Sequence, residues 1–166
     1  MRLFLVSILL ACVQFSWGQG PRIPEDVQLE EPSDYTDQEG LARKCLAWLI
    51  NTPLDEHVEK RMEVNAFVMM WLAGHPELKL DINSDVLPFI REDDTLIFPF
   101  IHGMALYQIG HPSETDTEKL HAEGLRTLAK AVRQNSCVKK TKSIKAVLKA
   151  ERKDELPELV AEWLKP

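Results

Sequence analysis

The stretch "DTEKLHAEGLRTLAKAV", residues 116–132, gives the clearest indication of the class of fold. Apolar residues recur along it at the spacing of one helix face: Leu120, Leu125, Leu128, Ala129 and Val132. This period indicates an amphipathic α-helix with one face against a core. Asp116 comes just before the run, and its carboxylate can accept hydrogen bonds from the free N–H groups of a first helical turn. The stretch is therefore expected to be a helix capped by Asp116.

Similar periodic runs lie on both sides of this stretch. Upstream, the two stripes are Leu41, Cys45, Trp48, Leu49 and Thr52, and Val58, Met62, Ala66, Met69, Met70 and Ala73. Downstream, the two runs contain Ile144, Val147 and Leu148, and Leu156, Val160, Trp163 and Leu164. In between, "DVLPFIRE" predicts a short helix capped by Asn83 or Ser84. "DDTLIFPFIHGMALYQIG" predicts a helix that begins or bends at Pro99.

Because no pair of strands is joined by a hairpin turn, these runs predict an all-α fold, an irregular bundle of about six or seven helices. A tetratricopeptide-like array of helical hairpins is the alternative, although the repeated motifs have no fixed period. A chain of this length is ordinarily one domain, so residues 37–166 are expected to form a single helical domain. Residues 19–36 are acidic and rich in proline, and are expected to be an extended or flexible segment.

The tripeptide Gly-His-Pro occurs twice, at residues 74–76 and 110–112, each time after an apolar helical run. One interpretation is a pair of matched histidine sites, His75 and His111. The other is a shared helix stop, in which glycine takes a left-handed conformation, the residue before proline is extended, and proline prevents continuation. "INTP" at 50–53 is a comparable stop without a histidine. This third case favours the helix stop.

Residues 1–18 are expected to be a secretory signal peptide. An arginine followed by the apolar run "LFLVSILLACV" is typical of one, and the small residues Ser16 and Gly18 favour cleavage after Gly18. The mature chain would then be extracytoplasmic, either periplasmic or secreted. "LLAC" leaves a second interpretation, a bacterial lipoprotein lipidated at Cys12. No other segment reaches the roughly 20 apolar residues of a transmembrane helix.

Cleavage after Gly18 would leave two cysteines, Cys45 and Cys137, in a compartment that permits disulfides. If they form a disulfide, it closes a loop of roughly 90 residues and contributes up to about 4–5 kcal/mol. The alternative is a buried helix residue at Cys45 and a free thiol near a helix end at Cys137.

Three segments carry a resemblance to a known group of proteins: "CLAWLINTPLDE", "KRMEVNAFVMMWLAGHP" and "FIHGMALYQI". In their spacing of Trp, Pro, Gly and Asn, about residues 41–107 resemble small secreted all-helical proteins of Bacteroidota-type bacteria. That group has no assigned activity. The resemblance implies a helical fold and an extracytoplasmic location, and it carries no catalytic residues to transfer.

The sequence offers little that points to catalysis. Its five histidines are His57, His75, His102, His111 and His121. No H-E-x-x-H motif is present, and the one Glu-x-x-His motif, Glu118–His121, falls short of the two that a helical di-iron site needs. Neither a G-x-S-x-G nucleophile elbow nor a glycine-rich phosphate loop occurs. We therefore expect no catalytic, cofactor-binding or metal-ligating residues. Whether the chain is an enzyme stays open, and the sequence favours a non-catalytic protein.

Charge is unevenly distributed along the chain, whose net charge is −6. This acidity argues against nucleic-acid binding. Residues 1–118 hold 8 Lys and Arg against 20 Asp and Glu, whereas residues 119–166 hold 12 against 6. In the basic part, one helix face combines Lys142, Lys145, Lys149 and Arg152. This face either binds an anion, a membrane or a partner, or is simply a solvated surface.

A further stripe is aromatic and rich in methionine: Trp48, Met69, Met70, Trp71, Phe98, Phe100 and Tyr107. At helical spacing such residues form core more often than the wall of a ligand cavity. Asn65 lies among them and, if buried, needs hydrogen-bond partners. Loop backbone is the expected partner, and a structural role is favoured over a ligand contact.

These patterns leave three functional hypotheses. The first is a non-catalytic extracytoplasmic protein that binds an unknown protein or surface component. The second is a carrier of a small molecule or lipid with an apolar cavity among the Trp, Met and Phe helices. The third is a metal-dependent hydrolase that uses the histidines.

Overall fold

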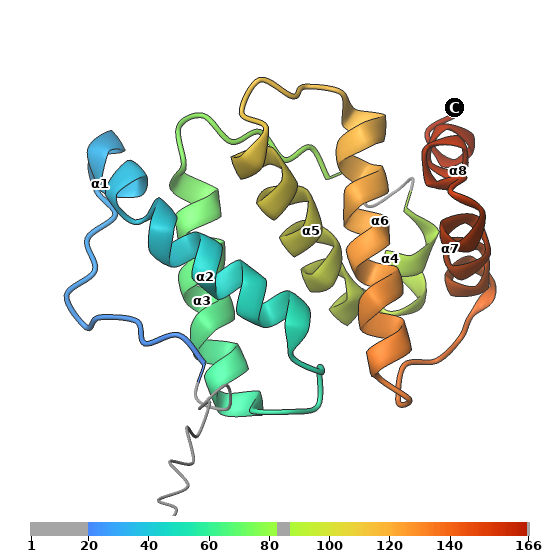
Figure 1. Ribbon diagram of the computed structural model, residues 1–166, viewed down its shortest axis with the longest axis horizontal. Coiled ribbons are helices and arrows are strands. Elements are labelled where there is room, and N and C mark those ends of the chain that lie inside the picture. Colours follow the sequence, from blue (N-terminus) through green and yellow to red (C-terminus); the bar gives the residue numbers. More distant parts are fainter. Residues whose placement is uncertain (1–19, 83–86, 166) are drawn as a thin grey trace, which may run out of the picture.

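The computed structural model describes residues 20–82 and 87–165, and every regular element in these ranges is helical. The elements are α1 (Pro32–Asp37), α2 (Glu39–Asn51), α3 (Val58–Gly74), α4 (Pro88–Glu92), the 3-10 turn η1 (Asp94–Leu96), α5 (Ile97–Gly110), α6 (Thr117–Gln134), α7 (Lys142–Lys153) and α8 (Leu156–Trp163) (Figure 1). The predicted all-α fold is confirmed. The expected signal peptide, Cys12, and the caps at Asn83 or Ser84 lie outside the described residues.

Helix α6, the helix predicted most firmly, lies between α5 on one side and the pair α7 and α8 on the other (Figure 1). The Asp116 carboxylate accepts hydrogen bonds from the backbone N–H groups of Glu118, at 2.9 Å, and Lys119, at 3.3 Å. The predicted cap is therefore confirmed. These two bonds satisfy donors that the first turn of a helix leaves free.

Two glycines allow α5 and α6 to approach closely. A Cβ atom at Gly103 would overlap the side chain of Thr127, and one at Gly124 would lie 2.6 Å from the ring of Phe100. Real Cβ atoms do not come so close to other heavy atoms, so any larger residue would push the helices apart. The spacing of this helix pair, which forms one side of the site described below, thus depends on Gly103 and Gly124.

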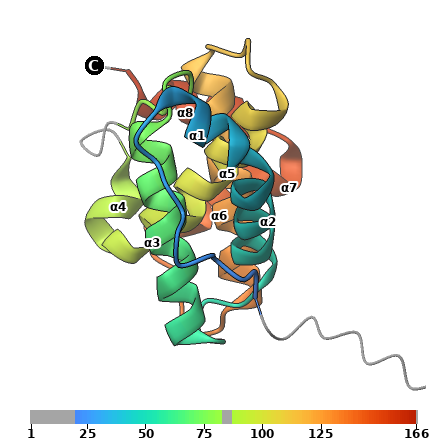
Figure 2. The same cartoon turned by 90° about the vertical axis from the view of Figure 1, so that its left-hand side faces the viewer.

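The buried apolar residues form two clusters that share α5. The first cluster is built by α2 and α3 and includes Ala105 and Ile109 of α5. The second is built by α4 to α8 and includes Phe100 and Met104 of α5. Residues 20–31 run along α3 without forming a helix, and Ile23, Val27 and Leu29 of this segment pack on the first cluster (Figure 2).

The prediction of which face of α3 is buried is wrong. The exposed fractions of Val58, Met62 and Met70 are 54%, 67% and 61%, although all three belong to the stripe predicted to be buried. The residues that are buried are Arg61, Val64, Phe67, Val68 and Trp71. Because α3 is apolar on more than one side, periodicity alone does not select a face. The large rings of Phe67 and Trp71 bury more apolar area and decide the orientation.

The prediction that each helix ends just before a proline is confirmed. The prediction that a glycine takes a left-handed conformation there is wrong. Helices α2, α3 and α5 end at the residue two before the proline, and the residue next to the proline leaves the helical conformation. Neither Gly74 nor Gly110 has a positive φ angle. The steric restriction on a residue before proline is sufficient to end a helix, so no left-handed cap is needed. Gly74 is required for another reason, since a Cβ there would overlap the hydroxyl of Tyr35.

The segment expected to be extended up to residue 36 contains the short helix α1 at its end. Pro32 occupies the first turn, where its missing N–H costs no hydrogen bond. The Asp34 carboxylate accepts hydrogen bonds from the N–H groups of Glu30 and Glu31, both at 2.9 Å. Proline placement and this capping contact explain why a helical turn forms here.

Both cysteines of the described residues are free thiols, so the candidate disulfide between Cys45 and Cys137 is wrong. Cys45 is completely buried in α2, whereas Cys137 is exposed in the connection between α6 and α7. Burial raises the pKa of the Cys45 thiol to about 12. Within residues 20–82 and 87–165, no helix has the length and apolar character needed to cross a membrane.

Candidate functional site

A cavity of about 300 Å³ lies where α2, α3, α5 and α6 meet. It is lined by Leu49, Ile50, Thr52, Leu54, Arg61, Asn65, Thr95, Phe98, Pro99, His102, Thr127, Ala131 and Gln134. Its volume is at the lower end of the range for small-molecule sites. Two of the larger hollows, of about 670 and 640 Å³, are more open to solvent. None of the buried polar atoms without a partner belongs to a residue that lines either of them.

Arg61 of α3 contributes the one charged group in the lining. The side chain is 7% exposed, and its terminal nitrogens donate to backbone carbonyls of Leu49 (3.3 Å), Pro53 (2.9 Å) and Thr52. Carbonyl groups at the end of a helix have no partners within the helix, so Arg61 satisfies the end of α2. Its Nε atom is buried and has no hydrogen-bond partner.

His102 of α5 contributes a second buried polar group. The residue is 2% exposed, and its Nε2 atom has no hydrogen-bond partner. Burial, and secondarily the positive charge of Arg61, lowers the pKa of His102 to about 3. The imidazole is therefore neutral at neutral pH, with one nitrogen that donates and one that accepts.

Asn65 lies one helical turn after Arg61 on α3 and contributes the third group. It is half-buried, and its Oδ1 atom is enclosed without a hydrogen-bond partner. The expected bond to loop backbone is not formed among the described residues. The structure thus places Asn65 in the lining of a cavity rather than in a satisfied core position.

These three atoms set the cavity apart from the rest of the described chain. Five buried side-chain atoms there lack a partner, and three of the five belong to residues that line this one cavity. Leaving a buried polar group unpaired costs about 1–3 kcal/mol, which is why such groups ordinarily have a partner in proteins. The concentration of three in one hollow is typical of a site that is completed by another molecule.

The electrostatic character of the cavity is positive. No Asp or Glu is among its lining residues. Burial lowers the pKa of Arg61, and the charge of Asp55, an exposed residue outside the lining, opposes this to a lesser degree. The charge of Arg61 is therefore held by carbonyl dipoles and by the ring of Trp48, whose centroid lies 5.8 Å from the Arg61 Cζ atom. Among the described residues, no carboxylate forms an ion pair with it.

The rest of the lining is largely apolar, with one polar edge. Leu49, Pro99 and Ala131 are buried, whereas Thr95, Phe98 and Gln134 are exposed. Phe98 is 38% exposed, and its ring centroid lies 6.5 Å from that of His102. The exposed residues therefore mark the side on which the cavity meets solvent.

The arrangement is suited to binding, and nothing in it resembles an activated nucleophile. The lining holds threonine hydroxyls and a neutral histidine, but no Ser, Cys, Lys or carboxylate that would complete a nucleophile and base pair. In the part of the chain that the structure describes, no three His, Cys, Asp or Glu side chains are grouped so that they could hold a metal ion.

The two histidines of the Gly-His-Pro motifs bond to backbone at helix ends. The Nδ1 atom of His75 accepts hydrogen bonds from the N–H groups of Glu77 and Leu78, both at 3.2 Å. His111 is exposed, stacks on Tyr107 with centroids 4.1 Å apart, and has its Nδ1 2.9 Å from the Tyr107 carbonyl oxygen. Neither ring lines the cavity.

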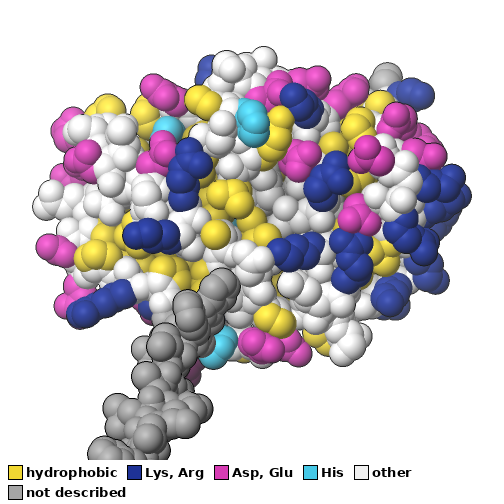
Figure 3. Space-filling model, viewed as in Figure 1, with side chains coloured by type: hydrophobic (Ala, Val, Ile, Leu, Met, Phe, Trp, Pro, Cys, Tyr) yellow, Lys and Arg dark blue, Asp and Glu magenta, His cyan; other side chains and the backbone are white. Residues whose placement is uncertain are grey.

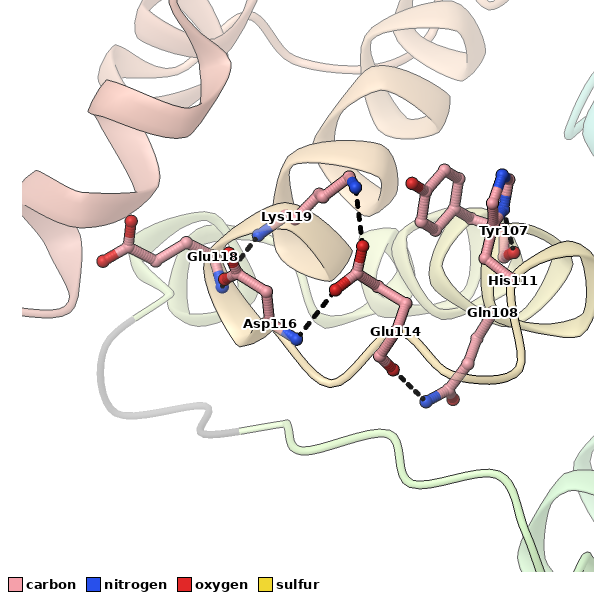
Figure 4. A network of polar contacts seen from close by, with 7 residues as sticks. All are labelled: Tyr107, Gln108, His111, Glu114, Asp116, Glu118 and Lys119. Atoms are coloured by element: carbon pink, nitrogen blue, oxygen red, sulfur yellow. Dashed lines mark hydrogen bonds and ion pairs between the residues drawn. The ribbon is translucent and has the colours of Figure 1, made fainter.

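The connection between α5 and α6 carries a polar network with a different character (Figure 4). Glu114 forms an ion pair with Lys119 at 2.6 Å and accepts a hydrogen bond from the N–H of Asp116 at 3.1 Å. The Gln108 amide donates to the Glu114 carbonyl at 3.3 Å, although its own Oε1 is buried without a partner. A hollow of about 290 Å³ adjoins this network and includes Gln108 and Glu114 in its lining.

The two residues of the Glu-x-x-His motif have different surroundings in the structure. Glu118 is exposed at the start of α6, whereas His121 is 1% exposed. The Nε2 atom of His121 lies 2.8 Å from the Asp81 carbonyl oxygen, and its Nδ1 atom has no partner. His121 therefore contacts the segment after α3.

The predicted basic face is present on α7. Lys142, Lys145, Lys149 and Arg152 are all exposed, and the opposite side of the helix buries Ile144 and Val147. Figure 3 shows Lys and Arg side chains gathered on this side of the molecule. Among the described residues, the three lysines form no ion pair, while Arg152 donates to the Leu148 carbonyl at 3.2 Å.

Sequence reasoning identified only part of the cavity. The aromatic and methionine stripe is mixed: Trp71 and Phe100 are core, as expected, whereas Met70 and Phe98 are exposed. Phe98 is the member of this stripe that lines the cavity. Arg61 was missed entirely. The signal for it was a basic residue one turn before Asn65, which places both side chains on the same face of the helix.

Comparison with protein families, with characterised proteins and with solved structures finds no match to this chain. The resemblance of residues 41–107 to secreted helical proteins therefore stays a prediction.

Proposed function

We propose that this chain is a non-catalytic binding protein that holds a small molecule in the cavity between α2, α3, α5 and α6. One observation carries the proposal. Three buried polar atoms without partners, Arg61 Nε, Asn65 Oδ1 and His102 Nε2, belong to residues that line one largely apolar hollow. This is the carrier hypothesis of the sequence, with the cavity located at a different set of residues.

The energetics favour an occupied cavity. A ligand that pairs with these three atoms removes an unpaired-group cost of about 1–3 kcal/mol for each. Contact with the apolar lining adds about 25 cal/mol for each Å² of apolar surface removed from water. Water can also satisfy the polar atoms but gains nothing from the apolar lining, so only an organic ligand obtains both contributions.

The proposal includes an extracytoplasmic location, which is supported by the apolar run and the small residues before Gly18. The intact mass of the protein recovered from expressing bacteria tests it. Cleavage after Gly18 gives a chain that begins at Gln19, whereas a lipoprotein gives a chain that begins at Cys12 and carries added lipid mass. A chain that retains residues 1–18 contradicts the location.

The binding function is tested by filling the cavity. Ala131 lines it and is 7% exposed, so an Ala131→Leu substitution occupies part of its volume. Ala161→Leu on α8, half-buried and outside the lining, is the matched control. In a thermal-shift screen of small organic compounds, a true ligand raises the melting temperature of the wild type and of Ala161→Leu, but not of Ala131→Leu. Equal shifts in all three proteins would place the ligand elsewhere.

A second candidate function rests on the basic face of α7, which we propose as a docking surface for an acidic partner. The supporting observation is three exposed lysines on one helix face that form no ion pair among the described residues. Binding of polyglutamate should weaken as salt rises, because salt screens exposed charges. It should also be lost when Lys145 and Lys149 are changed to Glu. Binding that survives this double change excludes the face.

A further inference from the structure

We infer that the ligand of the cavity is a small organic monoanion, a carboxylate on an apolar body, with its negative charge facing Arg61. This inference rests on the proposed function and names its ligand class.

The first step is the unbalanced charge of Arg61. Its guanidinium is positive at any pH relevant to a folded protein. The partners of its terminal nitrogens are the carbonyls of Leu49, Thr52 and Pro53, which are dipoles without net charge. Asp55, whose charge acts on Arg61, is exposed and outside the lining, so a ligand in the cavity can supply a closer and less solvated counter-charge. The Nε–H of Arg61 is the donor left for a carboxylate oxygen.

The second step is the sign and number of charges. A cationic ligand would be repelled by Arg61, since no carboxylate lines the cavity to hold it. A dianion such as a phosphate monoester would bring two negative charges to one positive group. His102 cannot supply the second positive charge, because burial and Arg61 keep its imidazole neutral. One negative charge matches the site.

The third step is the neutral polar surface beside Arg61. The Asn65 amide and the His102 ring each have one enclosed atom without a partner. Amide and imidazole groups can each present a donor or an acceptor, depending on amide orientation and tautomer. They can therefore pair with the second carboxylate oxygen or with a hydroxyl on the ligand, without adding charge.

The fourth step is size. The cavity has about 300 Å³, and a water molecule takes about 30 Å³ in the liquid, so it accommodates roughly ten non-hydrogen atoms. Leu49, Leu54 and Ala131 make much of the remaining lining apolar. A short aliphatic or aryl-alkyl carboxylate fits this description, and a long fatty acid does not.

The test compares matched ligands in titration calorimetry at pH 7.5. The probes are monocarboxylates from butanoate to 4-phenylbutanoate, each measured beside its own primary amide, which has nearly the same shape and no charge. The best acid should bind about 10- to 100-fold more tightly than its amide, as expected for one charge-assisted hydrogen bond. Arg61→Lys keeps the charge and can still reach carbonyls, but loses the Nε–H, and should reduce the preference for the acid. Asn65→Leu provides a second variant that leaves the contacts of Arg61 with α2 in place.

A spectroscopic readout separates a carboxylate at the site from one bound elsewhere. A nearby negative charge stabilises the protonated imidazole, so the pKa of His102 should rise from about 3 when the acid is bound. The amide should leave it unchanged or lower it further through desolvation. Titration of the His102 ring by NMR gives this comparison directly.

The outcomes distinguish the proposed binding function of the cavity from the inference that its ligand is a monoanion. If amides bind as tightly as acids and Ala131→Leu abolishes both, the cavity binds small molecules and the monoanion inference is overturned. If no probe binds, or if the acid binds Ala131→Leu as well as it binds the wild type, the proposed function is overturned too. Preference for the acid, lost in Arg61→Lys and accompanied by the shift of His102, supports both.

Discussion

Two polar groups of residues in this molecule have similar chemistry and different surroundings. The cavity brings Arg61, Asn65 and His102 together in a buried place, where each keeps one atom without a partner. The network between α5 and α6 brings Glu114 and Lys119 together at the surface, where they pair with each other (Figure 4). The mutual contact lowers the pKa of Glu114 and raises that of Lys119.

The difference indicates which of the two polar groups is suited to binding a ligand. Partners within the network account for most of its polar groups, with Gln108 Oε1 as the exception. The network connects two helices, and its ion pair between Glu114 and Lys119 is partly exposed to solvent. In the cavity, the folded chain provides no partner for Arg61 Nε, Asn65 Oδ1 and His102 Nε2, and water gains nothing from the apolar lining. The proposed binding site rests on these buried polar atoms that lack a hydrogen-bond partner.

The largest effect at neutral pH is expected from removing the guanidinium of the cavity. Arg61→Ala leaves the carbonyls of Leu49, Thr52 and Pro53 without donors and should lower the free energy of unfolding by about 3 kcal/mol. Urea unfolding followed by tryptophan fluorescence measures it. Arg61→Lys should recover part of the loss. A loss below about 1 kcal/mol for Arg61→Ala would show that water replaces the guanidinium at these carbonyls without a large cost.

The next prediction concerns how the free energy of unfolding depends on pH. In the unfolded chain His102 is protonated below its ordinary pKa of 6.5, whereas the folded chain takes up this proton only near pH 3. Stability should therefore fall as the pH drops through this window, by up to about 1.4 kcal/mol per pH unit from this residue. His102→Leu should lose that component, and His111→Leu, a change at an exposed ring, should keep it. Parallel curves for wild type and His102→Leu would contradict the burial of a neutral imidazole.

The sequence predicted the elements of this fold better than the site. The α6 helix was predicted with its cap because its single apolar stripe and Asp116 are local features. The face of α3 was predicted wrongly because two stripes compete, and the choice depends on what packs against them. The cavity is harder still. Asn65 was noticed as a polar residue among apolar ones, but its lack of a partner depends on Arg61, on His102 and on the ends of other helices. Absence of a partner is a property of the packed chain.

A smaller effect is expected for the apo protein when the unpaired imidazole is removed at neutral pH. His102→Leu should leave stability unchanged or raise it by about 1 kcal/mol, because a buried polar atom without a partner is exchanged for an apolar group. The matched control is His121→Leu, which should be destabilising, since it removes the 2.8 Å contact of His121 with the Asp81 carbonyl. Destabilisation by both would mean that His102 is satisfied in solution.

The smallest effect is expected in the network. Lys119→Ala removes an ion pair whose lysine side chain is 53% exposed, and exposed pairs contribute little because solvent screens them. The midpoint of urea unfolding should stay within the error of the measurement, and added salt should remove any residual difference from the wild type. Ligand binding at the cavity should be unaffected, in contrast to the Arg61 variants. A large loss of stability for Lys119→Ala would show that the network is as sensitive to its environment as the cavity, and the distinction between satisfied and unsatisfied polar groups would then not locate the binding site.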